Sequence, residues 1–211
     1  MVETVKGARQ DRRRATRRRI VAAATELFVA DGYTVTTLEQ VARRAGVAVQ
    51  TVYFHFGNKR TVLKEAVDVA AVGDDEPVAL LDRPQFREMS DEPEPRQFLE
   101  RWIGSGREIL ERVAPLMAVV RDAAGADPDM AAQWAANQQQ RATAYGEFAR
   151  QLADRDALRT DVGVDDAVDI LLALVSFEVY LILLDRGWTP QRWQEWMTDQ
   201  VAAALLEVRS P

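Results

Sequence analysis

The residue types that carry out chemistry are unevenly supplied in this chain of 211 residues. It has no cysteine and a single histidine, His55, which excludes thiolate nucleophiles, disulfides and multi-histidine metal sites. Carboxylates are plentiful, but no spacing marks a pair for acid–base work, and no phosphate-binding loop or nucleophile motif occurs. The sequence therefore predicts a protein that is not an enzyme and that uses no metal and no cofactor.

Basic, hydroxyl and amide groups gather near the N-terminus instead. Residues 1–64 carry 13 Lys and Arg against 5 Asp and Glu, whereas residues 65–211 carry 14 against 28. A basic module joined to an acidic remainder predicts a polyanion partner at one end only, although an ordinary solvated arginine-rich tail is the alternative. Within this module, 45-AGVAVQTVYFHFGNKRTVL-63 places polar groups between aromatic ones. Such groups suit contacts with nucleic-acid phosphates and base edges, and core packing is again the alternative.

A set of short helices must position that stretch. Apolar periodicity predicts a helix from Arg12 to Asp31-Gly32, then helices over 37–44, 48–54 and from Lys59 to about Ala71. Thr37 and Gln40 have the spacing of a capping box, and Gly46 suits the turn after the second helix. Residues 37–55 thus predict a helix-turn-helix whose second helix presents a polar face to the major groove.

The rest of the chain is predicted to be helical as well. A proline- and acid-rich connection, which could include a short helix at 78–82, precedes helices near 97–113, 115–124, 128–153, 164–186 and 190–208. The apolar stretch 167–184 is long enough to span a membrane, but Asp169 and Glu178 inside it are costly in lipid, so we expect a core or interface helix and no membrane partner. The predicted fold class is all-α with about nine helices. The predicted divisions are a disordered basic arm at 1–11, a helix-turn-helix domain at 12–71, a connection at 72–96 and a helical domain at 97–211.

The segment from Thr16 to Val67 resembles the DNA-binding domain of TetR-family transcriptional regulators. The resemblance is carried by 19-RIVAAATELFVADGYTVTTLEQVARRAGVAVQTVYFHFGNKRTVL-63 and covers about a quarter of the chain. Matching features occur in order, from Leu27-Phe28 through Ala45-Gly46-Val47 to Asn58-Lys59. The segment 186-RGWTPQRWQEWMTDQVAAALL-206 is similar to the last helix of many members. The resemblance implies a cytoplasmic, homodimeric repressor that binds a near-palindromic double-stranded DNA operator and leaves it when a small-molecule effector binds.

The resemblance also implies roles for individual positions. The first residues of the recognition helix would approach bases, and polar or basic residues around it would contact phosphates or the minor groove. The chain departs from the family pattern at Val49, where members often have a small or polar residue. The implied DNA-binding residues are Thr37, Val49, Gln50, Thr51, Tyr53, His55, Lys59, Arg17 and Arg18.

The acidic part of the chain offers wide apolar helix faces, and a monomer seldom exposes so much apolar surface. Two such helices from each protomer would form a four-helix dimer interface, for which the expected residues are Leu172, Val175, Val179, Trp193, Met197, Val201 and Leu205. Aromatic side chains with a few polar groups would line a pocket for an apolar or aromatic effector. The expected lining residues are Trp102, Met117, Arg121, Trp134, Tyr145, Phe177 and Glu178. For each of these, ordinary core packing is the alternative, and Glu178 could instead pair across the dimer or reach solvent.

Two other functions remain open from the sequence. A ligand-independent architectural DNA-binding protein would have no cavity, and small molecules would not change its affinity for DNA. An enzyme with an accessory helix-turn-helix would turn over a bound ligand. The sequence does not name the operator, the regulated genes or the effector, and it does not distinguish repression from activation.

Overall fold

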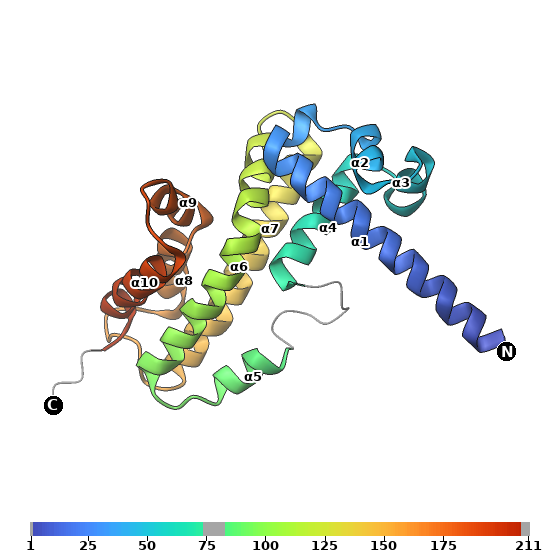
Figure 1. Cartoon of the computed structure of the whole chain (residues 1–211). Helices are drawn as coiled ribbons and strands as arrows, with labels where there is room; N and C mark the ends of the chain where they lie inside the picture. Colours follow the sequence, from blue (N-terminus) through green and yellow to red (C-terminus); the bar gives the residue numbers. More distant parts are fainter. Residues whose placement is uncertain (1, 74–82, 208–211) are drawn as a thin grey trace. The chain divides into compact units, whose positions relative to one another are not determined.

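A computed structural model of the chain describes residues 2–73 and 83–207 (Figure 1). These residues form helices and no strand apart from an isolated bridge between Leu158 and Leu206, so the predicted all-α class is confirmed. The chain divides into two compact units. We call Met1–Asp75 with Pro115–Gln133 the N-terminal unit, and Glu76–Ala114 with Trp134–Pro211 the helical body. The predicted domain at 97–211 therefore includes a stretch, 115–133, that packs with the N-terminal unit.

The N-terminal unit begins with four helices close to the predicted bounds. They are α1 (Val2–Val35), α2 (Leu38–Ala45), α3 (Val49–Phe56) and α4 (Lys59–Val72). Helix α1 starts at Val2, so residues 2–11 are helical rather than the predicted disordered arm. Gly32, inside α1, has φ 80° and ψ 172° and interrupts the helical geometry, which is a backbone conformation that glycine adopts easily.

The core of this unit comes from the apolar stripe that the sequence predicts on α1. Its fully buried side chains recur at four-residue spacing, α1 packs against α2 and α4, and α3 packs against α2 and α4 in turn. Ala42 on α2 is 3% exposed, which agrees with a helix crossing at a small residue. The fully buried apolar side chains of the four helices are Ile20, Ala24, Phe28, Val41, Val52, Val62 and Leu63.

The remaining helices are α5 (Pro84–Ser90), α6 (Pro95–Ala124), α7 (Pro128–Ala153), α8 (Val164–Leu174), α9 (Phe177–Asp185) and α10 (Pro190–Leu205). Helix α5 was not predicted, and the expected short helix at 78–82 lies outside the described residues. The predicted break before Pro115 is wrong, because α6 continues through it. An internal proline removes one backbone donor without ending the helix when packing holds both flanking turns.

The apolar stretch 164–186 forms two helices rather than the predicted one. Val175 and Ser176 leave the helical conformation, and the Ser176 Oγ accepts a hydrogen bond from the Val179 amide at 3.2 Å to begin α9. The Val175 carbonyl, freed by the break, accepts a hydrogen bond from the Tyr145 hydroxyl at 2.7 Å. By length and composition Val164–Asp185 would suffice to cross a membrane, with mean hydropathy 2.3. Here its two halves pack against α10.

Candidate nucleic-acid interface

The helix-turn-helix is held by local hydrogen bonds of the predicted kind. The Thr37 hydroxyl accepts a hydrogen bond from the Gln40 amide at 3.2 Å, and the Gln40 side chain accepts one from the Thr37 amide at 2.7 Å, which confirms the capping box. Gly46 lies in the left-handed region, with φ 65° and ψ 41°. The Val47 amide then donates to the Ala42 carbonyl at 3.0 Å, which closes the turn before α3.

Helix α3 has one buried face and one outward face. Val52 and Phe56 are buried, while the Gln50 side chain is exposed. Tyr53 is 49% exposed and Phe54 is 72% exposed, although both are large aromatic residues. The other implied base-reading residues, Val49 and Thr51, are partly exposed at the start of the helix, and Thr37 is exposed at the cap of α2. Most of the predicted contact positions on α3 and at the cap of α2 are therefore exposed or partly exposed, and Phe54 is exposed with them.

Arg17 has a role inside the fold rather than at the surface. Its guanidinium forms a bidentate ion pair with the Glu65 carboxylate on α4 and donates a hydrogen bond to the His55 carbonyl at 3.0 Å. It also lies over the Phe56 ring, 4.4 Å from the ring centre. This one side chain ties α1 to the end of α3 and to α4. The guanidinium of Arg17 is thus already engaged within the protein, and the phosphate contact expected there stays a prediction.

Lys59 is also engaged within the protein. Its ammonium donates to the carbonyls of Tyr33 and Thr36 at 2.6 and 2.9 Å and to that of Thr34 at 3.4 Å. It lies 4.3 Å from the centre of the Tyr33 ring, and burial lowers its pKa. An ammonium has three donors, and three carbonyls use them. The lysine at the start of α4 is thus accounted for by carbonyl groups where α1 ends and α2 is about to begin, and a phosphate contact at Lys59 stays a prediction.

His55 is partly buried at the inner edge of the same surface. Its Nδ1 is buried and has no hydrogen-bond partner in the described part of the chain. Burial lowers the pKa of His55, and the guanidinium groups of Arg13 and Arg17 lower it further. The ring is therefore neutral at pH 7, and Nε2 is the nitrogen left for a contact with a phosphate.

Exposed arginines of α1 extend the cationic surface beside α3. Arg12, Arg13 and Arg18 are exposed, and the Arg13 guanidinium lies 5.5 Å from the centre of the Phe54 ring. Arg19, by contrast, donates hydrogen bonds to the carbonyls of Ala45 and Gly46 and supports the turn. The sequence reasoning missed Phe54, yet the helical spacing of Val52 and Phe56 toward the core already places residues 53 and 54 outward.

The sequence of this helix-turn-helix matches a known protein family. Residues 20–66 match the model of the bacterial regulatory proteins of the tetR family. Residues 20–66 therefore form a TetR-family segment. It is 53% identical over 49 residues to the HTH-type transcriptional regulator SrpR of Pseudomonas putida, a match that covers 23% of each chain. It is 31% identical over 107 residues to the HTH-type transcriptional regulator TcmR of Streptomyces glaucescens, covering 51% of this chain and 42% of TcmR.

These matches span less than half the length of either curated relative. Beyond the matched segment the similarity is one of fold. The fatty acid degradation regulator FadR of Bacillus halodurans superposes with a TM-score of 0.71 at 14% identity, covering 93% of this chain and 97% of FadR. The described residues therefore share the fold of FadR well beyond the segment that the family model matches.

The expected ligand residues lie in several places of the described structure. A cavity of about 290 Å³ lies between α5, α6 and α7, and of the seven expected residues Trp102 lines it. Trp134 and Phe177 pack edge to face with ring centres 5.9 Å apart, and Tyr145 packs against Trp102. Met117 and Arg121 belong to the N-terminal unit.

Glu178 lies apart from that cavity. It is partly exposed, and its charge helps to raise the pKa of Tyr145, which burial raises most. Glu178 is therefore not among the residues that line the described cavity. A contact across the dimer and exposure to solvent are the two remaining possibilities for its carboxylate.

The expected dimer residues need a correction as well. Trp193, Met197, Val201 and Leu205 are fully buried in the core of the protomer, and Val175 is 2% exposed. The apolar helix faces were correctly identified, but these five side chains have no surface left for a second chain. Leu172 and Val179 are partly exposed, and Ile182, which was not expected, is 59% exposed on α9.

Proposed function

We propose that the protein is a DNA-binding transcriptional regulator that acts as a cytoplasmic homodimeric repressor and is released from its operator by a small molecule. The observation that carries the proposal is the outward face of α3, where Gln50, Tyr53 and Phe54 are exposed. Hydrogen bonds and ion pairs within the N-terminal unit hold this helix in place. A short rigid helix of this kind fits the major groove. The names of SrpR and TcmR, both HTH-type transcriptional regulators, support the same function.

Gln50 would supply sequence readout, because an amide side chain pairs bidentately with adenine. Tyr53, Thr37 and the α1 arginines would supply phosphate contacts, which set affinity but not sequence preference. Two copies related by a two-fold axis would place their α3 helices about 34–36 Å apart, roughly one turn of DNA. The operator would then be near-palindromic.

Dimerisation would use the apolar side chains that the protomer leaves exposed on α8 and α9, namely Leu172, Val179 and Ile182. Effector binding in the body would favour a spacing of the two α3 helices that no longer fits successive major grooves. Because such coupling is reciprocal, operator DNA would weaken effector binding by the same factor.

Fluorescence anisotropy on labelled DNA from beside the gene, with scrambled DNA as control, tests the proposal. We expect preferential binding to the native sequence that weakens steeply with salt. Gln50→Ala should weaken operator binding roughly tenfold and leave scrambled-DNA binding unchanged. Gln140→Ala, at an exposed glutamine of α7, is the matched control and should change neither.

Equal binding to both DNA sequences, unaffected by Gln50→Ala, would indicate an architectural DNA-binding protein instead. Absence of binding at low salt would contradict the role given to α3.

A further inference from the structure

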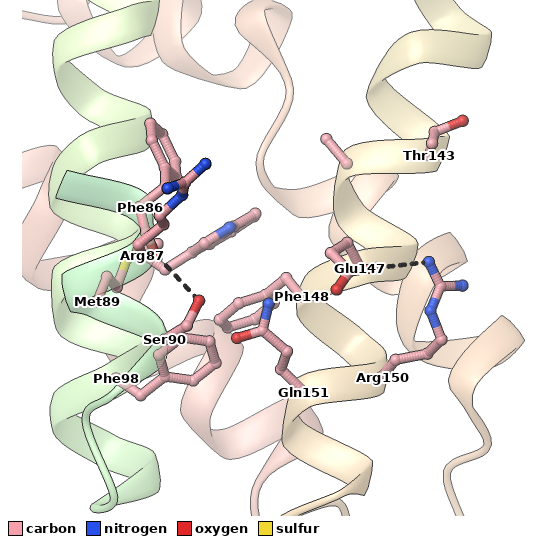
Figure 2. A pocket seen from close by; sticks show the side chains of 12 residues that line it. Phe86, Arg87, Met89, Ser90, Phe98, Thr143, Glu147, Phe148, Arg150 and Gln151 are labelled. Atoms are coloured by element: carbon pink, nitrogen blue, oxygen red, sulfur yellow. Dashed lines mark hydrogen bonds and ion pairs between the residues drawn. The ribbon is translucent and has the colours of Figure 1, made fainter. Parts of the chain in front are cut away.

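The cavity between α5, α6 and α7 has a wall of aromatic rings (Figure 2). The Trp102 and Phe148 rings stack with centres 4.1 Å apart and planes 19° apart, and Phe98 stacks on Phe148 at 5.0 Å and 29°. Phe86 and Met89, from α5, also line the cavity. Flat apolar faces with nearly parallel planes suit a flat, largely apolar molecule.

One polar atom in this cavity lacks a partner. The Oε1 of Gln151 on α7 is buried, and it accepts no hydrogen bond from the described residues. Its polar neighbours are engaged, because Glu147 pairs with Arg150 at 2.9 Å and the Ser90 hydroxyl donates to the Phe86 carbonyl at 2.9 Å (Figure 2). A buried unpartnered acceptor is costly and is satisfied by a donor from a bound molecule.

The size and charge of the cavity narrow the class of ligand. A cavity of about 150 Å³ holds one benzene ring, so about 290 Å³ accommodates two fused rings. The carboxylate of Glu147 is balanced by its partner Arg150, and the other charged lining residue, Arg87, is exposed, so the buried part of the lining offers no unbalanced charge to an ion. Two larger hollows of the body, of about 420 and 450 Å³, have charged and proline residues along their walls and lack this aromatic stack.

We propose that this cavity is the effector site and that it takes an uncharged, flat, two-ring aromatic molecule whose hydrogen-bond donor binds Gln151. Its role as an effector site rests on the function proposed above, whereas binding in the cavity does not. The aromatic stack supplies most of the affinity, and the Gln151 oxygen selects molecules that carry a donor. Helix α5 contributes Phe86, so an occupied cavity also fixes α5 against α6 and α7.

Isothermal titration calorimetry of the full chain with three matched probes tests this assignment. The probes are 2-naphthol, which is uncharged and has a donor, 2-methoxynaphthalene, which lacks the donor, and 2-naphthoate, which is an anion. We expect 2-naphthol to bind roughly three- to tenfold more tightly than 2-methoxynaphthalene, since one neutral hydrogen bond separates them.

Gln151→Met keeps the size of the side chain and removes the acceptor, so it should abolish that preference and leave the binding of 2-methoxynaphthalene unchanged. Gln140→Met, on the exposed side of α7, should retain the preference and serves as the control. The proposal is overturned if 2-naphthoate binds most tightly, if the preference survives Gln151→Met, or if no probe binds.

A second measurement separates this proposal from the proposed function. Operator anisotropy is repeated with and without saturating 2-naphthol. Release of DNA by 2-naphthol in the wild type but not in Gln151→Met, at a concentration that saturates only the former, supports the effector assignment. Binding of 2-naphthol in the cavity with no change in DNA affinity overturns the effector role while supporting the site. A chain that binds 2-naphthol but no DNA contradicts the regulator function alone.

Discussion

Charged side chains hold the N-terminal unit together around its outward face, whereas apolar packing dominates the helical body. In the first, Arg17 joins three helices through Glu65 and the His55 carbonyl, and Lys59 donates hydrogen bonds to carbonyl groups at the end of α1. In the second, Trp193 and Met197 are buried among other apolar groups. Hydrogen bonds fix direction, so they suit a surface that must match DNA. Apolar packing fixes volume but little direction, so it can surround a cavity for a ligand.

The largest expected effect tests the apolar half of that comparison. Trp193→Ala should lower the free energy of unfolding by about 3–5 kcal/mol, because it empties a fully buried site on α10. Urea unfolding at several protein concentrations measures this loss. If Trp193 were a dimer residue, the loss would instead appear as weaker association and would depend on protein concentration.

Ile182→Asp provides the contrasting variant for that experiment. Ile182 is 59% exposed, so the unfolding of the protomer should change by no more than about 0.5 kcal/mol. A charge within an apolar dimer interface should still shift the chain toward monomer in sedimentation. An unchanged oligomeric state would remove the exposed face of α9 from the interface.

The second effect tests the charged half of the comparison. Lys59→Met should lower the stability of the N-terminal unit by about 2 kcal/mol, since carbonyl groups of Tyr33 and Thr36 lose a charged donor. Thermal unfolding without DNA measures the effect. Arg43→Met, at an exposed cation of α2, should change stability little and serves as the control.

The opposite outcome at Lys59 would restore its assignment as a DNA contact. In that case stability would stay constant, while operator affinity and its dependence on salt would both fall. Thermal unfolding and operator binding of Lys59→Met therefore distinguish a stabilising contact within the protein from a contact with a DNA phosphate.

Local rules explain why the N-terminal unit was predictable. The capping box of Thr37, the left-handed Gly46 and the apolar stripe of α1 each depend on residues a few positions apart, so their spacing in the sequence determines them. The engagement of Lys59 was not predictable in this way, because its carbonyl partners lie 23 to 26 residues earlier in the chain.

The helical body depends more on contacts that are distant in sequence. The break at Val175 is stabilised by Tyr145, thirty residues away, so periodicity alone predicts one continuous helix. Likewise, periodicity shows that Trp193 lies on an apolar face but cannot tell whether its own chain or a second copy covers that face. The aromatic wall of the cavity was likewise not predictable from the sequence, because Trp102 on α6 and Phe148 on α7 meet only in the folded chain.

A third effect concerns Phe54, an exposed aromatic side chain that lies beside the cationic side chain of Arg13. Phe54→Ala should leave stability within about 0.5 kcal/mol, because the side chain is 72% exposed. It should weaken operator binding about three- to tenfold, through lost apolar contact with the groove and a less ordered Arg13. Anisotropy and thermal unfolding on the same sample test this. A loss of stability without a loss of binding would assign Phe54 to the fold.

The smallest effect tests whether burial, helped by the guanidinium groups of Arg13 and Arg17, keeps His55 neutral. The pKa of His55 is lower in the folded chain than the value of about 6.5 expected in the unfolded chain. At a pH between these two pKa values, the unfolded chain therefore binds more protons than the folded chain. Stability should be complete above pH 6.5 and should fall slightly as the pH drops through this window. His55→Asn should remove that slope. Because His55 is the single histidine, one imidazole resonance in NMR reports its pKa directly.

Operator DNA should move that same resonance the other way. A phosphate beside the ring favours the protonated form, so the pKa of His55 should be higher in the complex than in the free chain. By linkage, operator affinity should then increase as the pH falls from 7.5 to 5.5, even though the free protein becomes less stable. A pKa that stays unchanged on adding DNA would place the phosphate backbone away from His55 and leave Tyr53 and the α1 arginines to contact it.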